Sequence, residues 1–164
     1  RHAREHPVMG KMRTSLFSRC MGGNSTIIAM AKWPDEFRHI EALALLNVVS
    51  GPTFIERGAE NLGLDPAAAA KRLDERCRET TGFSVFDFRP QDYGHGVTIP
   101  TFVAQLRRDF LIHGEKDGQE IFDSLAAETK ELLWIDQSNQ RFYAYNHFGQ
   151  HPERLIEWFD KHMA

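Results

Sequence analysis

One cysteine stands where a strand-like stretch turns sharply into a helix-like one. The stretch Leu16–Asn24 reads Leu-Phe-Ser-Arg-Cys-Met-Gly-Gly-Asn, with Cys20 at the turn and small residues two positions before and after it. A thiol placed there is lifted off the edge of a sheet and faces the N-terminus of the following helix. The helix dipole and the free backbone amides favour a thiolate and can bind an oxyanion. These residues indicate a nucleophilic cysteine; a buried cysteine in a tight turn is the alternative.

The pattern Ser18-x-Cys20-x-Gly22 resembles the nucleophile elbow of the α/β-hydrolase superfamily, whose usual form is Gly-x-Ser-x-Gly. Ser18 replaces the first glycine, and Cys20 replaces the serine, as in dienelactone-hydrolase-like members. The resemblance implies that Cys20 attacks the acyl carbon of an ester, lactone or thioester. It also implies that the backbone amide of Met21 donates to the oxyanion, and it places Arg19 among the substrate contacts.

The resemblance further implies a triad acid just after a later strand. The stretch from Pro100 to Leu106 is strand-like, and Asp109 follows it, so Asp109 is the expected acid. The alternative interpretation is a surface aspartate in a polar turn.

The expected triad histidine is missing from its usual place. It should follow the strand Glu131–Ile135 by about five residues, but position 140 is Gln140, which cannot take a proton at neutral pH. The same loop offers His147 and His151. His147 is the candidate base, and the alternative is that it packs among neighbouring aromatic side chains. His151 directly precedes Pro152, which favours a place at a helix entry.

The apolar pattern alternates between strand-like and helix-like stretches, which predicts an α/β fold with a mostly parallel sheet and flanking helices. Asp65 as N-cap and Pro66 at the first helical position start the clearest helix. Ala69, Leu73 and Cys77 should form its packed face. The expected strands are 12–17, 41–49, 98–106 and 131–135, and the expected helices are 22–32, 66–80, 118–127 and one opening at Pro152.

The segment 51–96 interrupts this alternation and is expected to form a helical lid, with residues 1–50 and 97–164 forming the core. Its aromatic residues would shape an apolar acyl site that Phe88 borders, together with Tyr143 from the last loop; the alternative is that these aromatic residues form the core of the lid. In the superfamily several strands precede the elbow strand. We therefore expect that an N-terminal segment, a second chain or a second copy completes the sheet.

Composition excludes several classes of function. The net charge is −3 and the isoelectric point is near 6.3, which argues against nucleic-acid binding. No apolar run has the length of a membrane span, and Cys20 and Cys77 cannot build a disulfide framework. We expect a cytoplasmic protein. His2, Glu5 and His6 match an H-x-x-E-H pattern, but no third ligand is evident, so neither a metal nor a cofactor is expected.

The leading hypothesis is an enzyme that acts on a small-molecule acyl substrate through a cysteine nucleophile. Gln140 supports a second hypothesis, in which a catalytically impaired hydrolase fold serves in binding or assembly. A third keeps Cys20 reactive but non-hydrolytic, as in an acyl transferase or cyclase of a biosynthetic pathway.

Overall fold

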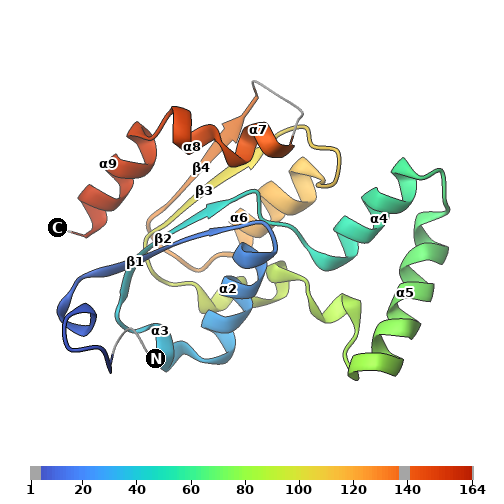
Figure 1. The fold of residues 1–164 in the computed structure, drawn as a ribbon, viewed down its shortest axis with the longest axis horizontal. Coiled ribbons are helices and arrows are strands. Elements are labelled where there is room, and N and C mark those ends of the chain that lie inside the picture. Colours follow the sequence, from blue (N-terminus) through green and yellow to red (C-terminus); the bar gives the residue numbers. More distant parts are fainter. Residues whose placement is uncertain (1–4, 137–140, 164) are drawn as a thin grey trace.

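The computed structural model describes residues 5–136 and 141–163, which form an all-parallel sheet in the order β1-β2-β3-β4 (Figure 1). This confirms the predicted fold class. The two central strands of the sheet are buried almost throughout, as expected of strands that helices cover on both faces. The strands are β1 (Thr14–Arg19), β2 (Ile40–Leu46), β3 (Thr101–Leu106) and β4 (Lys130–Ile135).

Helices cover both faces of the sheet (Figure 1). Helices α2 and α6 lie on one face together with the 3₁₀ segment η3, and α7, α8 and α9 lie on the other. The helical elements are η1 (Met9–Lys11), α2 (Met21–Lys32), α3 (Pro34–Phe37), α4 (Gly51–Asn61), α5 (Pro66–Thr81), η2 (Val85–Asp87), η3 (Pro90–Gly96), the π-helical turn η4 (Gly114–Gln119), α6 (Glu120–Ser124), α7 (Arg141–Tyr145), α8 (His147–Gln150) and α9 (Glu153–His162).

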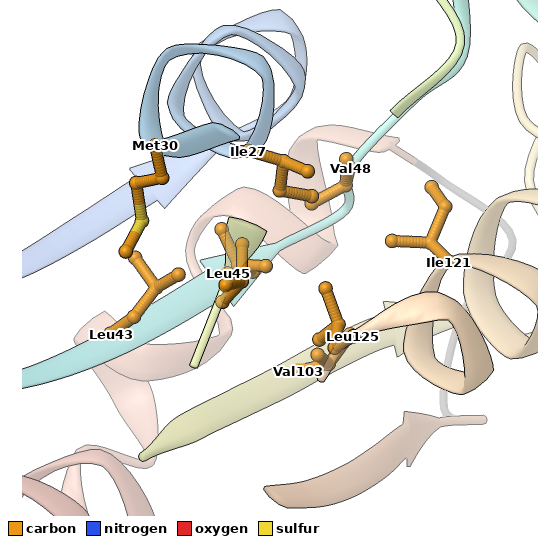
Figure 2. Packing of buried hydrophobic residues seen from close by; sticks show 9 residues of the cluster. Ile27, Met30, Leu43, Leu45, Val48, Val103, Ile121 and Leu125 are labelled. Atoms are coloured by element: carbon orange, nitrogen blue, oxygen red, sulfur yellow. The ribbon is translucent and has the colours of Figure 1, made fainter. Parts of the chain in front are cut away.

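Two apolar layers follow from the alternation of side chains along the strands. Figure 2 shows the first layer, in which Ile27 of α2 packs near Leu45 of β2 and Ile121 of α6. The second layer lies on the opposite face, where Phe102 of β3 stacks on Trp158 of α9 at a ring distance of 5.6 Å. All five side chains are almost inaccessible to solvent. Burial of these layers is the main force that holds the helices on the sheet.

The second strand ends earlier than its apolar run predicts. Asn47 adopts a left-handed backbone with φ 48°, which turns the chain away after Leu46. Its Oδ1 accepts a hydrogen bond from Leu106 N at 2.8 Å, and its own N–H donates to Ala104 O at 2.9 Å. Asparagine tolerates this backbone region better than the valines that follow.

Other predicted boundaries also need correction. Residues 51–61 form helix α4, which is not among the expected helices and has Pro52 in its first turn. The expected loop after β4 contains the short helices α7 and α8. In α9 the buried residue is Trp158, whereas Ile156 is 53% exposed. Strand β1 begins two residues later than predicted, and α6 is shorter at both ends.

The segment 51–96 leaves the sheet after β2 and returns to it before β3. Helices α4 and α5 stand beside the sheet, whereas η3 packs against α2 and α6 (Figure 1). The two ends of its outer part meet at Gly51, whose N–H donates to Phe88 O at 2.8 Å. Across the described residues, no helix combines the length and the apolar character needed to cross a membrane.

Candidate active site

The backbone at Cys20 makes a sharp turn between β1 and α2. Cys20 has φ 53° and ψ −129°, a conformation that non-glycine residues avoid. Its N–H donates to Leu46 O at 2.9 Å, which extends the pairing of β1 with β2, and its carbonyl accepts from Asn24 N at 3.2 Å, the first bond of α2. Such strain persists only where the surroundings fix the backbone, and it is concentrated at functional sites. The geometry is that of a strand-to-helix elbow with a half-buried thiol at its apex.

Small side chains are needed in this turn, but at a different position from the one predicted. A Cβ atom at Gly23 would lie 2.6 Å from Cγ2 of Val48, whereas one at Gly22 would meet nothing within 4 Å. Ser18 is partly buried, and its Oγ lies 2.9 Å from Oγ1 of Thr26. The close approach of helix to strand is therefore at Gly23, and Gly22 has room for a side chain.

The start of α2 suits an anion. Met21 is its first residue, and the first turn contains no acidic side chain. The first amides of a helix have no partner within the helix, and the helix dipole makes this end positive. Asn24 joins the end of β2 to the outer segment, because its Nδ2 donates to Val49 O at 2.8 Å and to Phe88 O at 2.9 Å. Asn24 is the last residue of the stretch Leu16–Asn24, and the sequence pattern alone does not indicate this role.

Asp109 lies in the loop after β3. Because the strands are parallel, this loop and Cys20 both lie at the carboxyl ends of the strands, and Asp109 is only 7% exposed. Its Oδ1 accepts hydrogen bonds from the N–H groups of Leu111 at 2.6 Å and Ile112 at 3.0 Å. The alternative interpretation of Asp109 as a surface aspartate is therefore wrong. Asp109 also borders a cavity of about 530 Å³, whose other lining residues are Arg57, Arg107, Arg108, Ile112, His113, Gly114, Glu115 and Trp134.

His147 begins α8 and is buried. Its ring lies 5.1 Å from that of Phe148 and 5.3 Å from that of His151, and its Nδ1 has no hydrogen-bond partner among the described residues. Burial, with a smaller effect of His151, lowers the pKa of His147 below its ordinary value, although Glu153 opposes this. The imidazole is therefore neutral at neutral pH and able to accept a proton.

Residues near His147 contact the strand that leads into Cys20. The ring of Phe148 meets Phe17 edge-on at 6.0 Å, and the guanidinium of Arg19 lies 5.1 Å from the ring centre of Tyr145. Helices α7 and α8 thus lie beside the end of β1. Gln140, at the usual position of the histidine, lies outside the described residues.

The predicted substrate contacts come from three different elements. Arg19 ends β1, Phe88 follows η2 and is 38% exposed, and Tyr143 is half-buried in α7. No group of three or more His, Cys, Asp or Glu side chains that could hold a metal ion occurs within 5–136 and 141–163.

Comparisons with known proteins agree with this geometry at the level of the fold. No protein-family model matches the sequence, and no curated protein matches it either. The structure is similar to the Pyrococcus furiosus esterase Pf2001, with a TM-score of 0.70 and 16% identity over 99% of this chain and 59% of that one. A structure of the metagenome-derived lipolytic enzymes LipS and LipT gives a TM-score of 0.62 at 18% identity, over 94% of this chain and 68% of that one.

The α/β hydrolase GrgF from Penicillium sp. sh18 is also similar, with a TM-score of 0.57 and 15% identity over 91% of this chain and 63% of that one. The chain therefore has the α/β-hydrolase fold, as the elbow-like sequence implied. It spans between 59 and 68% of the length of these three similar chains.

Proposed function

We propose that this chain carries the nucleophile, the acid and the base of an enzyme that hydrolyses an ester, lactone or thioester. The observation that carries the proposal is the strained backbone of Cys20 between β1 and α2, which places a thiol at the positive end of a helix. The similar structures include an esterase and lipolytic enzymes, which supports acyl substrates.

In the proposed reaction, the Cys20 thiol loses its proton to His147, and its sulfur attacks the acyl carbon. The amide of Met21 donates to the oxyanion. The bond to the leaving oxygen or sulfur then breaks, and His147 returns the proton to that atom. In the second half, water gives a proton to His147 and its oxygen attacks the thioester carbon. The C–S bond then breaks, the acid leaves, and His147 returns the proton to the Cys20 sulfur. Asp109 balances the imidazolium that forms in each half.

The substrate contacts remain part of the proposal. Phe88 and Tyr143 would border the acyl group, and Arg19 would lie beside it. Both aromatic side chains are partly accessible.

We also propose that a strand from outside these residues pairs with the outer edge of β1. Strand β1 pairs with β2 alone among the described strands, and Phe17 on it is 48% exposed. An unpaired edge with apolar side chains favours association. An N-terminal segment, a second chain and a second copy each satisfy this requirement.

The test compares the two cysteines. Cys20→Ala should lower the turnover of an activated ester or thioester about 1,000-fold or more, because the nucleophile is lost. Cys77→Ala is the matched control, since Cys77 is also half-buried but lies on α5, and it should leave turnover unchanged. Iodoacetamide should correspondingly label Cys20 faster than Cys77. If the Cys20→Ala variant folds and its turnover is unchanged, the enzymatic proposal is overturned in favour of a binding role.

The same assay tests the base. Activity requires neutral His147, so the rate should fall as the pH drops through the lowered pKa of this residue, below 6.5. His147→Ala should cost about 100-fold or more and remove that acidic limb. If His147→Ala keeps both the wild-type rate and the fall in rate at acidic pH, His147 is excluded as the base. Product analysis with a model thioester separates hydrolysis from acyl transfer or cyclisation.

A further inference from the structure

A second buried carboxyl group lies near the candidate site and has no role in the reaction proposed above. Asp117 lies in the π-helical turn η4, and its side chain is completely inaccessible to solvent. It is eight residues beyond Asp109 in the chain. A buried carboxylate requires several donors to offset its desolvation.

Asp117 binds two segments that are far apart in the chain. Its Oδ1 accepts from Ser50 N at 2.9 Å, and its Oδ2 accepts from His113 N at 2.9 Å. The hydroxyl of Thr53 in α4 is a third donor. Ser50 is the N-cap of α4, yet its own side chain makes no capping bond. Asp117 therefore supplies, from another segment, the anion that the start of a helix favours.

The same carboxyl group completes the turn that holds Asp109. The N–H groups of Leu111 and Ile112 donate to Asp109, and the next N–H, from His113, donates to Asp117. Three consecutive amides are thus held by two carboxyl groups. A turn bound in this way has little freedom to move the Asp109 side chain.

Helix α4 contacts this turn at two further points. Asn61 Nδ2 donates to Phe110 O at 2.7 Å, and Arg57 Nη2 donates to Asp109 O at 3.4 Å. Together with the bonds of Asp117 to Ser50 and Thr53, these contacts join α4 to the Asp109 loop along the length of the helix.

The electrostatics agree with a carboxyl group that depends on its donors. Burial raises the pKa of Asp117 to about 7, and the bonds from Ser50, His113 and Thr53 lower it, while nearby Glu120 raises it. Removal of a donor would further disfavour the charged form, which is the form that accepts all three bonds.

We propose that Asp117 is a positioning residue, which fixes the Asp109 loop against α4 and thereby holds the Asp109 carboxyl group in its catalytic place. This inference rests on the proposed function, because it assigns Asp109 a catalytic role. Asp117 itself touches no reacting atom and acts through the turn at 109–113.

The test uses the full chain with Asp117→Asn, and with Asp123→Asn as the matched control. Asp123 is exposed on α6, and its carboxyl group accepts a hydrogen bond from Gln119 on the same stretch of chain. The asparagine keeps one acceptor oxygen but presents an N–H₂ group to a backbone donor. Hydrogen exchange at the Ser50 and His113 amides should rise about tenfold or more in Asp117→Asn and stay unchanged in the control. The kcat for the activated ester should fall about tenfold while KM changes less than twofold.

Each outcome decides one part of the inference. Unchanged exchange at Ser50 and His113 would show that the link does not exist. Faster exchange with an unchanged kcat would overturn the positioning role while leaving the link in place. If the wild-type chain has no activity, the proposed function fails and the exchange data still decide the link. Should Asp117→Asn not fold, Thr53→Val deletes one donor only and should give smaller changes in the same direction.

Discussion

Helices α2 and α5 are stabilised in different ways. Helix α2 has 12 residues and buries Gly23, Asn24, Ile27 and Met30 against the sheet, but no side chain caps its N-terminus. Helix α5 is longer, with 16 residues, yet Ala70 is its only buried residue. The start of α2 carries the candidate nucleophile, whereas α5 lies in the segment beside the sheet.

Helix α5 is stabilised by local capping and surface ion pairs, whereas α2 is stabilised by packing against the sheet. Asp65 accepts a hydrogen bond from Ala68 N at 2.6 Å, Pro66 occupies the first turn, and Gly82 ends the helix with φ 77°. Ion pairs such as Arg78 with Asp74 at 2.7 Å lie along its surface. The comparison teaches that a clear helical signal in the sequence does not imply a buried helix. The elbow is instead fixed by the core, as a site that must keep a strained turn requires.

The largest effect should come from one matched pair of truncations. Ile27→Ala removes a fully buried side chain of α2 and should lower the free energy of unfolding by about 2 to 5 kcal/mol. Leu73→Ala removes a side chain of α5 that is 47% exposed and should cost less than about 1 kcal/mol. Urea denaturation of both variants measures the difference. If the two variants lose equal free energy of unfolding, packing is not what distinguishes α2 from α5.

A smaller effect distinguishes the two glycines that begin α2. Gly23→Ala forces a Cβ against Val48 and should destabilise the protein by about 1 to 3 kcal/mol. Gly22→Ala meets no neighbour and should be neutral or stabilising by up to about 1 kcal/mol, because alanine favours the helix. Thermal melting of the two variants provides the comparison. If Gly22→Ala were the more harmful change, the close contact between helix and strand would have to be reassigned.

The smallest effect concerns the local signals of α5. Asp65→Ala deletes the N-cap bond and should cost about 1 kcal/mol. The loss should appear as faster hydrogen exchange in the first turn of α5, with exchange in α2 unchanged. Faster exchange in both helices would show that α5 supports the core and would remove the contrast between them.

Much of the fold follows from local sequence. The strand, turn and helix around Cys20 were predictable because a strained nucleophile turn has a strong local signature, and α5 was predictable because Asp65 and Pro66 open it. The parallel sheet followed from buried runs such as that of β2. The short helices α7 and α8 were not predictable, because isolated helices of four or five residues have no intrinsic stability and form only where they pack.

The sequence by itself determined which groups are available for chemistry: a thiol at a turn, an acid after a strand, and a histidine in the last segment in place of the one that Gln140 replaces. Only the tertiary structure decided that Gly23, and not Gly22, makes the close contact, and that Asp109 is buried. It also decided that Asp117 joins α4 to the Asp109 loop. These facts depend on distances between segments far apart in the chain, and those distances are set by how the helices pack on the sheet rather than by neighbouring residues.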